Sequence, residues 1–459
     1  MNISREKIVS HTADPYPAWP PGQRYGAAIE PGGLIDLPAA RAWFRRLDQA
    51  REAGLYTFAL PLAGQSGRPT AYGDRDLISF STYGYLALNG HPKIVGAVHD
   101  AVDRFGSTTG GVRLLTGTTE LHRQTESALA AWLGTDDTVL YNSGYDANLA
   151  AISSLFGQAD VAFVDERAHR SLLDGCQLAG VRVRRFRHGD AEHLDELLAE
   201  HRAHRGRKVV IVDGVYSMDG DQASLKELVN LKARYGAFLL VDESHALGVL
   251  GTGGRGTCAE QRVDIQEIDI ITSSLAKAFP SVGGLVAGSN PLTTYLRHRS
   301  APFMFSSASA PANTAAILAT LDVLVSEPEH LERLHRNSAE LSELVRRVIG
   351  TPHEVASPIV PVILGDEARA YTWARILLDD GIYASAVPAP AVPAGQSRLR
   401  LCATAAHTSQ DFALLEDGLR HCLALESAPE QLLSFMQDVT PPPLATTSGD
   451  VVAGYEAAA

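Results

Sequence analysis

The chain has 459 residues, of which 45% are hydrophobic and 20% charged, the composition of an ordinary globular enzyme with room for two or three domains. Its formal net charge of −13 argues against a surface that binds nucleic acid or an anionic membrane. There is no uncharged apolar run of about 18 residues and no signal-peptide core near residue 1, so we expect a cytoplasmic protein without a membrane span.

The cysteines give no sign of a disulfide framework or a metal centre. Cys176, Cys258, Cys402 and Cys422 show neither CxxC pairing nor the spacing of metal ligands. Four free thiols in a reducing compartment are the simplest interpretation, and no metal site is predicted.

The first 75 residues are expected to form an N-terminal arm. Proline and glycine are frequent at its start, and residues 37–53 (LPAARAWFRRLDQAREA) have the apolar spacing of a helix. This helix is expected to pack on a partner subunit or on the main domain, or else to be a solvated linker.

Two segments that follow carry short motifs. Residues 80–88 (FSTYGYLAL) are predicted to form a strand, and residues 105–113 (FGSTTGGVR) form a glycine-rich segment that carries little information alone. Residues 138–141 form an apolar strand that leads through 142–148 (NSGYDAN) into a helix. The free N–H groups at such a helix start favour an anion such as phosphate, although the segment could also be an ordinary connection from strand to helix.

Three later strands each end in an aspartate: residues 161–165, 208–213 and 237–242. Between the last two, residues 225–236 have helical spacing with a terminal glycine. The resulting β-α-β pattern predicts parallel strands whose carboxyl ends share one edge of a sheet, where α/β proteins place ligands. Asp242 would lie at that edge, and His245 follows within a glycine-rich segment.

The stretch 271–284 (ITSSLAKAFPSVGG) presents a lysine at the end of another apolar strand. Ser274 and Lys277 lie in the turn. Burial at a strand end lowers the pKa of an amine and suits Lys277 to Schiff-base chemistry.

The C-terminal third reads as a smaller domain. Residues 315–325 and 331–349 have the spacing of amphipathic helices, and Arg398 and Arg400 alternate in a predicted strand where only one of them needs to point inward. From residue 441 the composition changes to Pro, Ser, Thr, Gly and Ala, which indicates a flexible tail.

These motifs, in unbroken order over residues 76–425, resemble the α-oxoamine synthases, a family of pyridoxal 5'-phosphate (PLP) enzymes. The resemblance is carried by VDESHALGVLGTGGRG, SLAKAF, DGVYSMDGD and SRLRL. It implies an α/β protein of PLP-dependent fold type I (aspartate aminotransferase-like), with a large, mostly parallel sheet domain and a smaller C-terminal α+β domain. The expected division is 1–75 arm, 76–309 large PLP-binding domain, 310–440 small domain and 441–459 tail.

The resemblance also implies roles for individual residues. Lys277 would bind PLP covalently, Asp242 would pair with the protonated ring nitrogen, His245 would bond the phenolic oxygen, and Arg400 would hold the amino-acid carboxylate. Further cofactor-binding residues would be Gly144, Tyr145, His169 against the ring face, Ser217 near the phenolic oxygen, Ser274, and Ser306 and Ser307 reaching the neighbouring subunit's phosphate. A homodimer with shared active sites follows.

Some positions depart from the family pattern. Tyr83 and Gly84 stand where an Asn-Asp pair is expected, which puts the amino-acid substrate in doubt and leaves Tyr83 as a candidate substrate-binding residue. Ala87 replaces a glycine and Ala276 a serine. The last two departures favour the branch that makes signalling α-aminoketones, and hence a role in secondary-metabolite or signal-molecule biosynthesis.

The implied reaction is the PLP-dependent condensation of a small amino acid with an acyl thioester, giving an α-aminoketone, CO2 and a free thiol. Glycine, alanine, serine and 2-aminobutyrate remain open as amino acids, and acyl-CoA or an acyl carrier protein as donor. The alternatives are an aminotransferase or carbon–carbon lyase of the same fold, or a catalytically silent scaffold.

Overall fold

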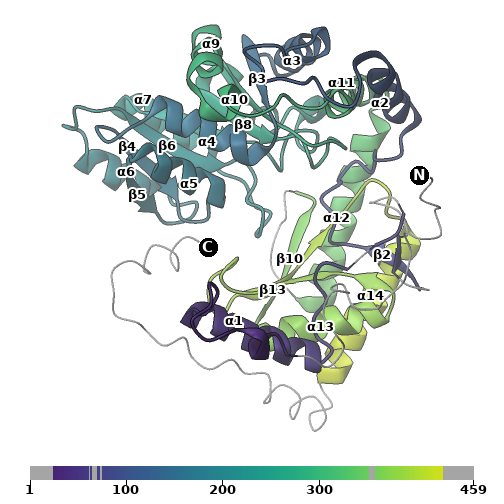
Figure 1. Cartoon of the computed structure of the whole chain (residues 1–459). Coiled ribbons are helices and arrows are strands. Elements are labelled where there is room, and N and C mark those ends of the chain that lie inside the picture. The colour runs from purple at the N-terminus through teal and green to yellow at the C-terminus, as the bar shows by residue number, and fades with distance from the viewer. Residues whose placement is uncertain (1–23, 61, 65–69, 73–74, 351–356, 427–459) are drawn as a thin grey trace.

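The computed structural model describes residues 24–60, 62–64, 70–72, 75–350 and 357–426, which form two lobes (Figure 1). The predicted tail at 441–459 and the first part of the predicted arm lie outside the described residues. The large lobe is built on a sheet of seven strands in the order β3-β9-β8-β7-β6-β4-β5. The strands are β3 (Asp137–Tyr141), β4 (Val161–Asp165), β5 (Arg182–Phe186), β6 (Lys208–Asp213), β7 (Phe238–Asp242), β8 (Ile270–Ser274) and β9 (Gly284–Gly288).

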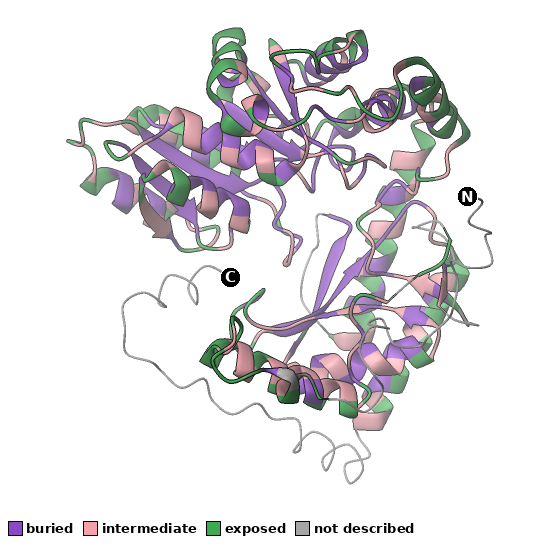
Figure 2. Ribbon diagram, in the orientation of Figure 1, coloured by how far each residue is buried: buried purple, intermediate pink, exposed green. Residues whose placement is uncertain are grey.

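All pairings in this sheet are parallel except those of β9, which runs antiparallel to β3 and β8. The predicted large, mostly parallel sheet is therefore confirmed. Its central strands are buried on both faces, as Figure 2 shows, because helices cover each side and the strand sequences are almost entirely apolar.

Helices of the large lobe connect and cover these strands. They are α2 (Pro92–Phe105), α3 (Glu120–Leu133), α4 (Gly144–Leu155), α5 (Arg170–Ala179), α6 (Ala191–Glu200), α7 (Leu225–Tyr235), α8 (Thr257–Gln261), α9 (Asn290–Arg299), α10 (Ala301–Met304) and α11 (Pro311–Ser326), with short 3-10 turns at η3 (Thr252–Gly254) and η4 (Ile265–Glu267). The predicted helix at 225–236 is α7, and Gly236 ends it in the left-handed conformation, as its sequence signal predicts.

The small lobe has its own core. An antiparallel sheet of β10 (Ile359–Gly365), β13 (Ser397–Cys402) and β12 (Ser385–Val387) packs against α12 (Glu329–Ile349), α13 (Glu367–Asp379) and α14 (Ser409–Glu426). A second sheet joins β1 (Thr70–Tyr72), β2 (Arg75–Ser79) and β11 (Ile382–Tyr383). In the N-terminal segment, η2 (Tyr25–Ala28) precedes α1 (Pro38–Glu52), which lies beside α13 in the small lobe (Figure 1).

One predicted strand is wrong. Residues 80–88 contain no strand, because β2 ends at Ser79 and the chain then turns: the Ala87 N–H donates to the Gly84 carbonyl, and Ala87 has a φ of 54°. Ala87 thus occupies a left-handed position that glycine adopts at lower cost. This bend carries the following residues into the large lobe.

The predicted domain boundaries remain predictions, and two elements next to them make contacts with the other lobe. β2, at the start of the predicted large domain, pairs with β11 of the small lobe. α11, at the start of the predicted small domain, packs on α2 and α3 of the large lobe. α12 then runs from one lobe to the other (Figure 1).

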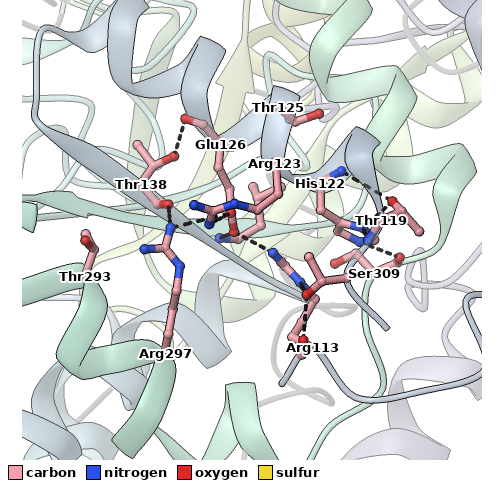
Figure 3. A network of polar contacts seen from close by, with 12 residues as sticks. Arg113, Thr119, His122, Arg123, Thr125, Glu126, Thr138, Thr293, Arg297 and Ser309 are labelled. Carbon is pink, nitrogen blue, oxygen red and sulfur yellow. Dashed lines mark hydrogen bonds and ion pairs between the residues drawn. The ribbon is translucent and has the colours of Figure 1, made fainter. Parts of the chain in front are cut away.

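An ion network around the buried Glu126 links several elements of the large lobe (Figure 3). Arg113, Arg123 and Arg297 approach the Glu126 carboxylate at 2.8, 2.9 and 3.4 Å, and the Leu140 N–H donates to it at 3.1 Å. Glu126 is almost fully buried, so its charge is balanced by this cluster rather than by water. The network joins α3, β3, α9 and the glycine-rich loop that contains Arg113.

Within the described part of the chain, no helix is long and apolar enough to cross a membrane. All four cysteines are buried and none forms a disulfide.

Candidate active site

The carboxyl ends of β4, β6, β7 and β8 surround a cavity of about 180 Å³. Parallel pairing in register brings Asp213 at the end of β6 beside Asp242 at the end of β7, and Asp242 beside Thr272 of β8. The cavity is lined by the predicted residues Gly144, Tyr145, His169, Asp242, His245, Ser274 and Lys277. It is also lined by Ser143, Asn148, Ser171, Asp213, Val215 and Ser244.

Lys277 projects from the turn after β8 and makes no hydrogen bond or ion pair with any described residue. Burial lowers the pKa of this amine, and the charge of Asp242 opposes the shift. A free amine with a lowered pKa, beside a carboxylate, is the arrangement that a Schiff-base lysine requires.

Asp242 is held by two donors. The Asn148 side chain donates to Oδ2 at 2.6 Å, and the Ser244 N–H donates to Oδ1 at 2.9 Å. Burial, followed by the charge of Asp242, raises the pKa of the neighbouring Asp213 well above its usual value. Burial therefore favours the neutral form of Asp213 and concentrates the negative charge of this pair on Asp242.

His169 is fixed through a chain of polar contacts that starts at Asp242. Asn148 also donates to Ser171 Oγ at 2.8 Å, and Ser171 lies 2.7 Å from His169 Nδ1. The Ser171 N–H donates to the same Nδ1, which makes Nδ1 an acceptor and leaves the proton of a neutral imidazole on Nε2. Burial lowers the pKa of His169 and favours this neutral form.

The N-terminus of α4 forms one end of the cavity. Gly144 lies against β8 so closely that a Cβ there would come within 2.7 Å of the Ser274 side chain, which explains the glycine. Tyr145 hydrogen-bonds Asp174 through its hydroxyl. The first-turn N–H groups and the helix dipole would hold an anion.

His245 and Arg400 are linked through Tyr85, a residue that the sequence did not single out. Arg400 Nη2 lies 3.4 Å from the Tyr85 hydroxyl, which is 2.7 Å from His245 Nδ1. A guanidinium only donates, so the hydroxyl proton points to His245. Burial lowers the pKa of His245 well below its usual value, so this imidazole is neutral and carries its proton on Nε2.

Both arginines of β13 face the large lobe, although the sequence pattern required only one of them to point inward. Arg398 and Arg400 are two residues apart and share a face of the strand. Arg398 is fully buried against Asp219 at 2.7 Å and the Met218 carbonyl at 3.0 Å, and Arg400 Nε donates to the Ser217 carbonyl at 2.5 Å. Ser217 thus contacts Arg400 through its backbone and does not line the cavity.

Tyr83 lies outside this cavity, in a neighbouring one of about 330 Å³ that Lys277 also lines. Its other lining residues include Gly84, Ala276, Val282 and Asn313. Three positions that depart from the family pattern, Tyr83, Gly84 and Ala276, therefore meet on one side of the lysine.

Ser306 and Ser307 do not reach the cavity of their own chain. The Asn142 side chain donates to Ser306 Oγ and to the Ser307 carbonyl, each at 2.8 Å. This anchors their loop next to the end of β3, with Ser307 exposed.

The residues present fit PLP in chemical terms. The unpaired amine suits the aldehyde of that cofactor, and the anchored carboxylate suits its ring nitrogen. The neutral imidazoles suit the ring face and the phenolic oxygen, and the helix N-terminus suits the phosphate.

Comparison with known proteins agrees. A family model described as aminotransferase class I and II matches residues 75–416. The chain is 40% identical over 369 residues to an 8-amino-7-oxononanoate synthase of Geobacter sulfurreducens (80% of this chain, 94% of the relative) and 36% identical over 369 residues to that of Bacillus pumilus (80% and 93%).

Solved structures show the same likeness. A serine palmitoyltransferase variant from S. paucimobilis, with a bound compound of PLP and myriocin, aligns with a TM-score of 0.81 at 30% identity, covering 86% of this chain and all of that one. An 8-amino-7-oxononanoate synthase from Francisella tularensis aligns with a TM-score of 0.67 at 25% identity, covering 76% and 99%. The chain therefore belongs to the α-oxoamine synthases, within aminotransferase class I and II, and is a PLP-dependent C-acyltransferase of fold type I.

Proposed function

We propose that this enzyme condenses a small α-amino acid with an acyl thioester and releases CO2 and the free thiol, to give an α-aminoketone. The observation that carries the proposal is the position of Lys277. Its amine has no partner among the described residues and borders two cavities, one with the Asp242 carboxylate and the other with space for substrate.

PLP, when bound, supplies an electron-accepting ring that stabilises the negative charge formed at the amino-acid Cα. The protein residues position the groups around it. Asp242, held by Asn148 and Ser244, provides a negative charge for a ring cation, and the neutral His169 provides an uncharged surface beside it. Burial lowers the pKa of Lys277 and so favours the neutral form of the amine, the form that can bind the cofactor and take the Cα proton.

Arg400 is the proposed carboxylate anchor. Its Nε and Nη2 contact Ser217 and Tyr85, and Nη1 makes no hydrogen bond with a described residue. That nitrogen can donate to a substrate carboxylate while the other two keep the guanidinium in place. Loss of this carboxylate as CO2 follows formation of the new carbon–carbon bond, and a proton then returns to Cα.

The substrates are proposed as classes of compound and not as single molecules. Tyr83, Gly84 and Ala276 line the second cavity beside Lys277, so the departures from the family pattern fall where they would affect substrate choice. Glycine, alanine, serine and 2-aminobutyrate are the candidate amino acids, with an acyl-CoA or carrier-protein thioester as donor. The departures at Ala87 and Ala276 support a role in secondary-metabolite or signal-molecule biosynthesis.

We also propose a homodimer with shared active sites. Leu115 and Phe305 are each 81% exposed, and they lie on two loops that an isolated bridge between Val112 and Ser307 holds together. Such exposed apolar residues beside Ser306 and Ser307 fit a surface covered by a second copy, whose active site these serines would reach.

The test is CO2 release that depends on an added acyl thioester. Purified enzyme with PLP is incubated with each of the four amino acids and with CoA or carrier-protein thioesters, and products are identified by mass spectrometry. We expect one combination to release CO2 and thiol in equal amounts. Amino-group transfer or cleavage without a thioester would instead indicate the aminotransferase or lyase alternatives.

Lys277→Ala is the decisive variant, because it removes the group proposed to bind PLP and to move the proton. We expect loss of the visible absorption of lysine-bound PLP and a fall in turnover of more than about 10²–10⁴-fold, the usual contribution of a general base. Lys226→Ala, an exposed lysine on α7, is the matched control and should retain both. Full activity in Lys277→Ala would contradict the proposal.

A further inference from the structure

A cluster of two histidines and a glutamate lies where the lobes are joined, away from the residues that line the active site. His91 is the N-cap residue of α2, Glu327 is the C-cap residue of α11, and His330 lies in the first turn of α12. One ligand atom from each lies within 4.8 Å of the others. His91 Nε2 is 3.0 Å and His330 Nε2 is 3.4 Å from the same oxygen, Glu327 Oε2.

The geometry points to a site for a divalent transition-metal ion of the zinc class, bound by His91 Nε2, Glu327 Oε2 and His330 Nε2 with water in the fourth position. Two histidines and a glutamate are a known zinc ligand set. In a tetrahedron with bonds of about 2.0–2.1 Å the ligand atoms are about 3.3 Å apart. The two distances to Glu327 already match, so only the separation of the imidazoles has to close.

The ligands are in suitable charge states. The ion pair with Lys93, together with the contact to His91, lowers the pKa of Glu327 to about 2, so the carboxylate is ionised at neutral pH. Burial lowers the pKa of His330 and favours a neutral imidazole. Lys93 contacts Oε1 at 2.7 Å, which leaves Oε2 facing both histidines.

Arg333 is the group that opposes binding. It lies 2.8 Å from His330 Nδ1, and because arginine only donates, the proton of His330 is on Nε2. Coordination requires that proton to move to Nδ1, and Arg333 to turn away. His91 also donates from Nε2 to the Glu327 carboxylate, so its proton would likewise move to Nδ1, which is buried and has no hydrogen-bond partner in the described chain.

A bound ion would link the start of α2, in the large lobe, to the junction of α11 and α12. Since α12 continues into the small lobe, the ion would restrain the connection between lobes (Figure 1). We therefore expect it to raise thermal stability, independently of the reaction catalysed.

The experiment uses the PLP-loaded enzyme, freed of metal with a chelator, and measures Zn²⁺ binding by calorimetry and Co²⁺ binding by its visible spectrum. We expect one ion per chain, a tetrahedral Co²⁺ spectrum and a higher melting temperature with Zn²⁺. His330→Gln should weaken binding by at least about 100-fold, since loss of even outer groups costs 10–100-fold. His421→Gln is the matched control, because His421 forms a 2.8 Å pair with Asp380 and belongs to no group of three potential ligands among the described residues.

Arg333→Gln gives an independent test in the opposite direction. A glutamine oxygen can accept the His330 Nδ1 proton, so we expect Zn²⁺ to bind about tenfold or more tightly, as for other groups that orient a ligand. Equal Zn²⁺ affinity in wild type and His330→Gln would overturn the proposal. So would weaker binding in Arg333→Gln, a measurement that stays informative if His330→Gln does not fold.

Discussion

At the scale of single residues, Tyr85 connects the proposed carboxylate anchor to the histidine in the cavity. Its buried hydroxyl donates to His245 and accepts from Arg400. Tyr85→Phe would leave His245 Nδ1 without that donor and Arg400 with one contact fewer. We expect PLP to remain bound, while kcat/KM for the amino acid falls about 10–100-fold, the equivalent of the roughly 1–3 kcal/mol cost of an unpaired buried group.

Separate measurement of KM and kcat distinguishes a role of Tyr85 in positioning Arg400 from a general loss of protein stability. A loosened Arg400 should raise KM for the amino acid more than it lowers kcat. Tyr295→Phe, which removes a half-exposed hydroxyl on α9, should leave both within about twofold. A Tyr85→Phe enzyme with unchanged constants would show that the contact chain does not serve the substrate.

Tyr85 also marks the limit of inference from single residues. The family pattern directed attention to Tyr83, two positions earlier, because an Asn-Asp pair is expected there. Tyr83 is half exposed in the second cavity, and Tyr85 is fully buried. Tyr83 precedes the turn that the Ala87 N–H closes onto the Gly84 carbonyl, whereas Tyr85 lies within it, and a pattern of apolar residues contains no information about that turn.

At the scale of elements, the strand ends that form the site were predictable, because a short segment of sequence is enough to predict each of them. Apolar runs ending at Asp213 and Asp242, followed by the turn with Lys277, fix a parallel register that brings these groups together. The contacts of Arg398 were not predictable. Its partners Met218 and Asp219 are 180 and 179 residues away in the sequence, so their meeting depends on how the lobes dock.

The Glu126 network gives a stability prediction for α3. Glu126→Gln removes the carboxylate that neutralises the buried Arg113, whereas Arg297 keeps its ion pair with Asp137 and the Arg123 side chain is about half exposed. We expect the large lobe to lose about 3–5 kcal/mol, measured as a shift of its urea unfolding midpoint. Glu120→Gln on the same helix breaks only an exposed pair with Arg104 and should cost less than about 1 kcal/mol. Equal effects would contradict the assigned role.

His188 makes stability depend on pH. It follows β5 and bridges Asp165 at 3.0 Å and Asp221 at 2.7 Å. Burial alone would lower the pKa of His188, but these two contacts outweigh it and raise the pKa to about 9. Since the unfolded value is about 6.5, the stabilisation is complete below about pH 6.5 and is lost as the pH rises through 9.

We therefore expect wild type to exceed His188→Gln in stability by on the order of 2 kcal/mol at pH 6, and by much less at pH 10. Melting temperatures of both proteins across this range give the measurement, and their difference removes the contribution of other groups that titrate at high pH. A difference that stays constant with pH would exclude charged His188 as its source.

At the scale of the whole molecule, the loop with Ser306 and Ser307 does not line the cavity of its own chain. Asn142 and the bridge to Val112 hold it in place, and the exposed Phe305 adjoins it. An anchored loop with an exposed serine and an exposed aromatic ring fits a surface that a second subunit covers better than one that stays in contact with water. The enzyme should therefore behave as a dimer in light scattering, and Phe305→Asp should weaken it.

Sharing of active sites predicts complementation between two defective chains. Lys277→Ala should be inactive, and the double variant Ser306→Ala, Ser307→Ala should bind PLP more weakly. In a mixed dimer one site would combine both defects, while the other would have an intact lysine and intact serines from opposite chains. Mixing under exchange conditions should thus restore activity toward half of the wild-type value per mixed dimer, as measured by thioester-dependent CO2 release. If each chain used its own serines, both sites of the mixed dimer would stay defective and mixing would restore nothing.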